Sequence, residues 1–173
     1  MFPSTTTMGS TTVLSLPLGK PNARVAPKLT VSKVADKLNN LTSEFRSLSE
    51  PIERVKRLLH YASLLPPMGA AERVPENRVA GCATEVWVVA EVDERRRMRF
   101  RADSDSEISK GFCWCLVWML DGALPEDLLL LHTDHFQHIN VGLGITLKAQ
   151  SRTNTWHNVF FHMQNATRDF IIN

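Results

Sequence analysis

Residues 79–87 read Val-Ala-Gly-Cys-Ala-Thr-Glu-Val-Trp, and this stretch connects a polar loop to the first residues of an apolar strand. Gly81 allows the backbone to turn tightly or to adopt a positive φ immediately before Cys82. A thiol at such a turn is open to a partner molecule, and we take Cys82 as the candidate reactive residue. Many loop cysteines are inert, however, and free cysteines usually behave as small apolar residues. The reactive role of Cys82 therefore depends on what the rest of the chain indicates.

Two antiparallel strands are predicted directly after this turn. Residues 85–92 are apolar and rich in β-branched side chains, and residues 97–102 alternate strictly, so that Met98, Phe100 and Ala102 share one face. The segment between the two runs is predicted to be a hairpin loop. Because an antiparallel sheet can face water on one side, we expect the intervening arginines to form a solvated face rather than a binding patch.

A buried helix is predicted after the hairpin. Ser104 and Glu107 have the spacing of a capping box, in which each side chain bonds the backbone of the other residue. Residues 111–120 are apolar on all sides, which indicates a central helix covered in most directions. Asp121-Gly122 is expected to end it.

Two amphipathic helices and a loop are predicted before the central stretch. Residues 32–47 carry apolar side chains at helical spacing, and Ser49 is expected to cap a second helix that ends at Pro66-Pro67. Residues 68–80 have no period and contain Gly and Pro, so they are expected to form an exposed loop. The apolar face of the second helix is predicted to consist of Ile52, Val55, Leu58, Leu59 and Ala62.

Two further helices are predicted near the C-terminus. Pro125-Glu126-Asp127 is expected to begin a short helix, and Ser151 to cap the last one. Arg152 would then lie in the first turn, where the helix dipole disfavours a cation. Either a neighbouring acid or a functional task would explain its presence there. The apolar stripe of this last helix is predicted to be Val159, Phe160, Met163, Ala166 and Phe170.

The histidines and glycines before the last helix do not form a convincing motif. His132, His135 and His138 suggest a zinc site, but on a helix the first and last would lie about 240° apart. Gly142 and Gly144 lack the further glycines and the preceding strand of a phosphate loop. We therefore expect no metal and no cofactor.

Length, charge and cysteine content exclude several classes of protein. The 173 residues, of which 43% are hydrophobic, suit one domain with a tail, and the net charge of +2 does not indicate nucleic-acid binding. The longest apolar run is about half the length of a membrane span. The three cysteines do not suggest a disulfide framework. Cys113 and Cys115 would lie about 200° apart on the buried helix, so we expect them to fill the core rather than to act as a pair.

The first 33 residues have the composition of an organelle transit peptide. They are rich in Ser and Thr, they carry several basic residues, and the first acidic residue is Asp36. A disordered tail of accidental bias is the alternative. We expect a leader at residues 1–33 and the folded domain at residues 34–173.

Four motifs occur in order along the chain. Together they resemble the SufE family, the sulfur-acceptor proteins that work beside a cysteine desulfurase, and the similarity runs from about residue 36 to residue 170. The motifs are Glu76-Asn77-Arg78-Val79 leading to Gly81-Cys82 and Val86-Trp87, then Ala102-Asp103-Ser104-Asp105 followed by Ile108 and Lys110-Gly111, then Leu143-Gly144, and finally Ser151-Arg152-Thr153-Asn154.

The resemblance implies an α/β (α+β) fold shared with IscU-type scaffolds, in which a small antiparallel sheet packs against helices. It also implies that Cys82 receives the terminal sulfur of the desulfurase's cysteine persulfide, and that Arg152 takes part in activating the desulfurase. The remaining site residues that it implies, as loop or partner contacts, are Arg78, Gly81, Asp103 and Asp105.

The chain departs from the family pattern at two places. Many members have Gln-Ser where this chain has Ala83-Thr84, and a glycine where it has Thr155. The first change lies beside the cysteine, so it can alter the polarity of the loop or the choice of partner. Neither change removes the sulfur of Cys82.

The resemblance implies an accessory role rather than an enzyme. The chain would accept a persulfide from a pyridoxal-phosphate-dependent cysteine desulfurase of the SufS or NifS kind, and would pass the sulfur to a downstream scaffold for iron–sulfur cluster assembly. The attacking group in such transfers is a thiolate, which Arg78, Arg152 or the strand arginines would favour if they lie close to Cys82. A loop that tucks its cysteine against an apolar face and swings out on docking would protect the persulfide. The location would be the chloroplast stroma, with the mitochondrion as the alternative.

Two other functions remain open at this point. An IscU-type scaffold for a metal or an iron–sulfur cluster needs three or four converging soft ligands. A hydrolase would need a histidine base beside Cys82, but no histidine lies in a recognisable partner motif.

Overall fold

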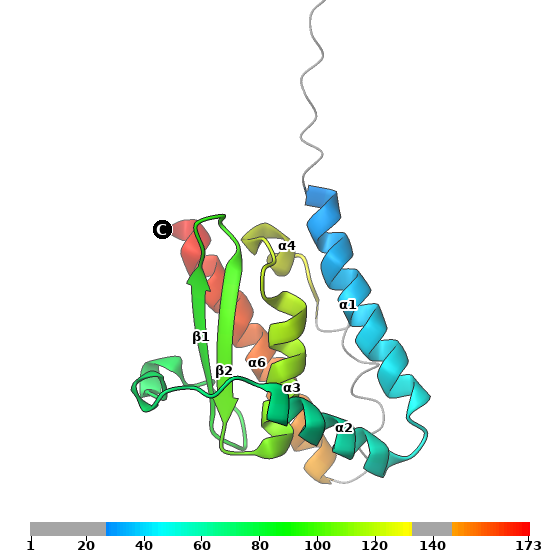
Figure 1. Ribbon diagram of the computed structural model, residues 1–173. Coiled ribbons are helices and arrows are strands. Elements are labelled where there is room, and N and C mark those ends of the chain that lie inside the picture. The colour runs from blue at the N-terminus through cyan, green and yellow to red at the C-terminus, as the bar shows by residue number, and fades with distance from the viewer. Residues whose placement is uncertain (1–26, 133–146) are drawn as a thin grey trace, which may run out of the picture.

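The computed structural model describes residues 27–132 and 147–173, with side chains for residues 33–132 and 155–173. Strands β1 (Val86–Val92) and β2 (Met98–Ser104) form an antiparallel hairpin, and helix α3 (Glu107–Leu120) packs against it. Figure 1 shows α3 between this hairpin and helix α1 (Pro27–Ser47), with α6 (Leu147–Ile172) behind the sheet. The predicted fold class, a small antiparallel sheet packed against helices, is confirmed.

The hairpin has the two faces that its alternation predicts. The buried face consists of Val86, Val88, Met98, Phe100 and Ala102. On the other face Arg99 pairs with Asp93 and Asp121, and Arg101 pairs with Glu72 and Glu91. These arginines are about half exposed, so they form a solvated, charge-paired surface as expected.

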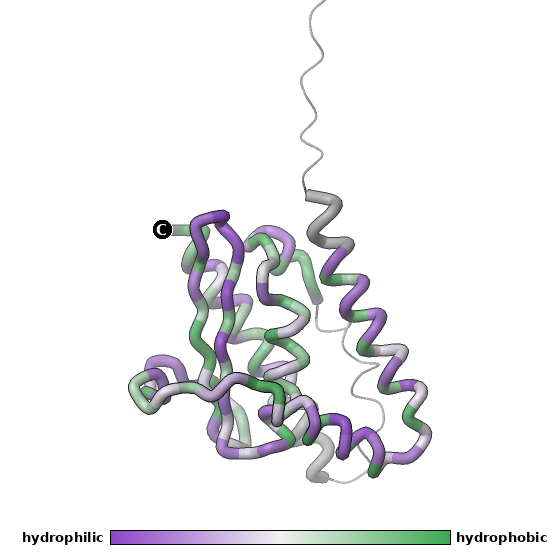
Figure 2. Tube along the Cα trace, in the orientation of Figure 1, coloured by the Kyte–Doolittle hydropathy of each residue, from purple (hydrophilic) through white to green (hydrophobic). Residues whose placement is uncertain are grey.

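Helix α3 is the centre of the core, as its all-round apolar sequence predicts. Figure 2 shows hydrophobic residues concentrated along α3, whereas α1 alternates between hydrophobic and hydrophilic positions. The predicted capping box is wrong, because Ser104 is the last residue of β2 and donates its hydroxyl proton to the Glu85 carbonyl at 2.6 Å. Ser106 is the N-cap instead, and it accepts from the Ser109 backbone N–H.

Helix α2 (Pro51–Leu64) packs closely on α3 through one narrow side. Its buried residues are Leu58, Tyr61 and Ala62, and Tyr61 stacks on Trp114 with a ring separation of 4.1 Å. The broader apolar face predicted from periodicity is wrong at Ile52 and Leu59, which are 58% and 42% exposed, because α3 covers only the Leu58 side.

The predicted N-terminal boundaries need correction. Helix α1 begins at Pro27 rather than at Ser32. Glu50, not Ser49, precedes α2, and its side chain makes no capping hydrogen bond. The predicted leader of residues 1–33 therefore overlaps the first turns of α1, and the position where it ends stays a prediction.

The segment before the site is more ordered than a featureless loop. It contains two short 3-10 turns, η1 (Ala70–Glu72) and η2 (Pro75–Asn77). Most of its residues are exposed as predicted, but Met68 and Val79 are buried and anchor its two ends.

Helices α4 (Pro125–Leu129) and α6 close the core beside α3. The Gln164 amide donates to the backbone carbonyls of Leu128 and Leu131 and so ties the two helices together.

Phe170 is 45% exposed, so the predicted apolar stripe of α6 does not extend to that residue. Ser151 lies inside α6 rather than at its cap, because the helix begins at Leu147, and Arg152 is therefore not in the first turn. Within the described ranges, no helix combines the length and apolar character needed to cross a membrane.

We expect Gly111→Ala to destabilise the protein, because its Cβ would lie 2.4 Å from the Leu58 carbonyl oxygen. Separating α2 from α3 should lower the free energy of unfolding by about 1–3 kcal/mol, in spite of alanine's better helix propensity. Gly69→Ala is the matched control, since nothing lies within 4 Å of its Cβ position. Urea unfolding of both variants measures the difference; equal stabilities would contradict the close contact.

Candidate functional site

Cys82 lies on the turn that the sequence singles out, between the 3-10 turns and β1. Gly81 has φ of 80°, which confirms the predicted positive φ before the cysteine. Gly81 and Ala83 are exposed, whereas Cys82 is half-buried and packs against the hydrophobic core. The turn therefore directs its sulfur inward while its backbone faces water.

Both ends of this turn are fixed to the sheet. On one side the Val79 backbone N–H donates to the Val86 carbonyl at 2.8 Å. On the other side the Glu85 backbone N–H donates to Asp105 Oδ1 at 3.0 Å, and the Asp105 N–H donates to the Glu85 carbonyl at 3.2 Å. Asp105, one of the predicted site residues, thus anchors the segment that follows the cysteine.

Asp103 and Arg78 support the same region through ion pairs of their own. Asp103 is 3% exposed and forms an ion pair with Arg73, which links the segment before the turn to β2. Arg78 forms an exposed ion pair with Glu85 at 3.4 Å. Arg78 thus joins the two flanks of the turn, whereas Asp103 joins the preceding segment to β2.

The unusual pair after the cysteine is also accommodated. Ala83 is exposed, and the hydroxyls of Thr84 and Ser109 are hydrogen-bonded at 2.9 Å. The Thr84 hydroxyl thus connects the turn to the first part of α3.

Burial sets the resting state of the Cys82 thiol. Desolvation raises the pKa of Cys82 above its ordinary value, while hydrogen bonds with the side chains of Asn158 and Thr155 lower it by a smaller amount. Among the side chains that the structure describes, no charged group contributes to this pKa. The expected arginine support is therefore absent from this part of the chain, and the side chain of Arg152 lies outside the described residues.

Asn158 and Thr155 are neighbours of the cysteine that sequence patterns do not reveal. Thr155 is notable in the sequence only because it stands where the family pattern has glycine. Asn158 is a polar residue next to the buried Val159, and it lies under the turn only because α6 packs against β1. That packing is a tertiary contact that spacing alone does not reveal.

The other two cysteines belong to the core, as predicted. Cys113 and Cys115 are both 0% exposed, and burial raises the pKa of each thiol. His135, His138, Gly142 and the Leu143-Gly144 motif lie outside the described residues. In the ranges that are described, no three His, Cys, Asp or Glu side chains are placed to hold a metal.

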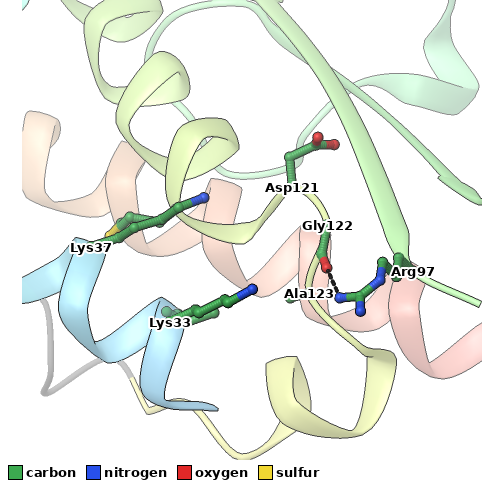
Figure 3. A pocket seen from close by; sticks show the side chains of 8 residues that line it. Lys33, Lys37, Arg97, Asp121, Gly122 and Ala123 are labelled. Carbon is green, nitrogen blue, oxygen red and sulfur yellow. Dashed lines mark hydrogen bonds between the residues drawn. The ribbon is translucent and has the colours of Figure 1, made fainter. Parts of the chain in front are cut away.

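A small cavity of about 60 Å³ lies at the opposite end of the hairpin, between α1 and the C-terminus of α3 (Figure 3). Its lining includes Lys33, Lys37 and Arg97. Lys37 Nζ donates to the Trp118 carbonyl at 2.8 Å, and Arg97 Nη1 donates to the Gly122 carbonyl at 2.9 Å. These two cations bind one carbonyl in the last turn of α3 and one just after the helix, which is the structural task expected of cations at a helix C-terminus.

A solved structure shares this fold. The solution structure of a hypothetical protein from Thermus thermophilus superposes with a TM-score of 0.63 at 23% sequence identity, covering 79% of this chain and 97% of that one. At this identity the likeness concerns the fold alone.

Two plant proteins are similar in sequence over most of the chain. The SufE-like protein 2, chloroplastic, of Arabidopsis thaliana is 55% identical over 140 residues, which cover 81% of this chain and 54% of that protein. A quinolinate synthase, chloroplastic, of Nicotiana tabacum is 56% identical over 137 residues, which cover 78% of this chain and 19% of the synthase. The chain thus spans about half the length of the first relative and about a fifth of the second.

The SufE-like protein 1 of Arabidopsis thaliana, named chloroplastic/mitochondrial, is 33% identical over 134 residues, which cover 78% of this chain and 35% of that protein. These relatives confirm the predicted plastid localisation. The family model SufE, described as an Fe-S metabolism associated domain, matches residues 39–167. The match confirms the predicted family and supports a SufE-type role in iron–sulfur metabolism, and the chain belongs to the SufE family.

Proposed function

We propose that the chain accepts sulfur on Cys82 from the cysteine persulfide of a desulfurase and thereby activates that enzyme. The observation that carries this proposal is the placement of Cys82 on an exposed turn with its sulfur half-buried against the core. A thiol in this position is shielded at rest, and it lies on a backbone that a partner can reach.

The transfer needs no oxidant and no metal from this chain. The Cys82 thiolate attacks the outer sulfur of the desulfurase persulfide, and a new S–S bond forms on Cys82. The S–S bond of the desulfurase breaks, and its electron pair stays on the desulfurase cysteine, which leaves as a thiolate. A nucleophile of the downstream scaffold then attacks the outer sulfur on Cys82 and returns the Cys82 thiolate.

Loop movement would bring the shielded sulfur to the partner. Val79 and Glu85 are tied to the sheet by backbone hydrogen bonds, so the movement is confined to the residues between them. Gly81 already occupies a conformation that other residues rarely adopt, and glycine tolerates the further backbone changes of an outward swing. The fixed ends let the turn close again after transfer.

A mass measurement tests the acceptor role. The protein incubated with a cysteine desulfurase and cysteine should gain one sulfur atom per chain, and Cys82→Ser should gain none. Cys115→Ala is the control, because its thiol is fully buried and should not affect uptake once circular dichroism shows that the variant is folded. Sulfur uptake by Cys82→Ser equal to that of the natural chain would contradict the proposal.

The role of Arg152 is tested separately. We expect Arg152→Ala to fold normally and to weaken desulfurase activation about tenfold at limiting protein, as for the loss of about 1.4 kcal/mol of interaction with the enzyme. Arg168→Ala is the matched control on the same helix, where the arginine is exposed and bonds Asn165. Steady-state cysteine turnover measures both variants; equal activation by Arg152→Ala and the natural chain would exclude this role.

A further inference from the structure

The Gly81–Cys82 turn rests on two polar side chains of α6. A Cβ placed on Gly81 would lie 3.0 Å from Asn158 Nδ2 and 3.5 Å from Asn158 Cγ, so the amide lies directly against the turn. Hydrogen bonding by the side chains of Asn158 and Thr155 lowers the pKa of Cys82, which places both groups near its sulfur. These two residues lie one helical turn apart and therefore on the same side of α6.

The helix holds these groups in fixed positions. Trp156, Val159 and Phe160 are buried in the core around them, and Trp156 packs edge-on against Phe112 with ring centroids 5.4 Å apart. Thr155 itself is 3% exposed. The two hydrogen-bonding groups therefore stay in place, while the turn that carries the sulfur has exposed residues on both sides.

Among the described residues, the hydrogen bonds of Asn158 and Thr155 are the interactions that favour the Cys82 thiolate. The charged and titratable groups that the structure describes near the turn do not contribute. Cys113 faces Cys82 from α3, but burial raises its pKa and keeps it neutral. On β2, Asp103 is engaged by Arg73, and beside the turn Arg78 is engaged by Glu85. None of these charged side chains, all of which the structure describes, shifts the pKa of Cys82.

We propose that Asn158 and Thr155 are positioning residues that donate hydrogen bonds to the Cys82 sulfur and stabilise its anionic form while it is tucked beneath the turn. The proposal rests on the acceptor role of Cys82, for which the thiolate is the attacking species. Burial opposes ionisation of the sulfur, and two fixed donors offset part of that effect. Thr155 supplies a hydroxyl at a position where the family pattern has glycine, so this chain has a donor there that a glycine would lack.

The pH dependence of Cys82 alkylation by iodoacetamide tests the donors without any desulfurase. Cys113 and Cys115 are fully buried, so in the folded protein the reaction reports on Cys82. Asn158→Ala should raise the apparent pKa of Cys82 by about one unit, which leaves about tenfold less thiolate at neutral pH. Asn158→Asp should raise it further, because a carboxylate replaces the donor with a negative charge of nearly the same shape. Asn165→Ala, an exposed asparagine of the same helix, should change nothing.

Substitutions at Thr155 separate the hydroxyl from the shape of the side chain. Thr155→Val removes the donor at nearly constant volume and should also raise the apparent pKa, whereas Thr155→Ser keeps the hydroxyl and should restore the natural value. Thermal unfolding of each variant establishes that it is folded. A merely structural role would lower stability without this order of pKa values.

Two sets of outcomes distinguish this inference from the acceptor role. If Asn158→Ala and Asn158→Asp leave the pH profile unchanged, the donor role is wrong, whatever the sulfur-transfer assay shows. If the profile shifts as expected and the natural chain gains no sulfur from the desulfurase, the donors are real and the acceptor role is wrong. If both hold, sulfur uptake by Asn158→Ala should be about tenfold slower at neutral pH, and this loss should shrink as the pH rises.

Discussion

The sulfur of Cys82 lies at the boundary between the core and water, and the opposition between burial and hydrogen bonding at that boundary governs the site. Burial raises the pKa of the thiol, so the resting group is protonated and poorly reactive. The side chains of Asn158 and Thr155 act in the other direction by hydrogen-bonding the sulfur. A thiol in this state reacts slowly with oxidants and alkylating agents at rest. Under the proposed function it ionises more readily once a partner draws it away from the apolar surface.

The remainder of the fold keeps this boundary in place. Helix α3 lies at the centre of the core, and α2 packs on it so closely that Gly111 lies against the Leu58 backbone. Helix α6 carries the hydrogen-bonding groups, and its buried residues Val159 and Phe160 fix their position. The hairpin holds both ends of the turn through backbone bonds and Asp105. The segment between these supports is only a few residues long, which suits the outward and return movement that the proposed function requires.

Local patterns predict the elements well and their contacts less well. The alternation of Met98, Phe100 and Ala102 and the apolar run of α3 each specify a burial pattern directly, and both are confirmed. The predicted capping serine of α3 is wrong because Ser104 and Ser106 both precede Glu107, and only the end of β2 decides between them. The exposure of Ile52 and the identity of the neighbours of Cys82 depend on which helices meet, and a periodic pattern does not contain that information.

In the plant relatives the same domain is a part of longer chains, which include a quinolinate synthase. The Cys82 turn is held by the hairpin and α6 of the same domain. Such a site is compatible with chains of different length and composition around that domain. The central claim, that burial outweighs the donors at rest, is tested most directly by NMR titration of the protein labelled with ¹³C at the cysteine Cβ. We expect a midpoint for Cys82 above that of an ordinary cysteine; a midpoint near or below neutral pH would contradict this claim.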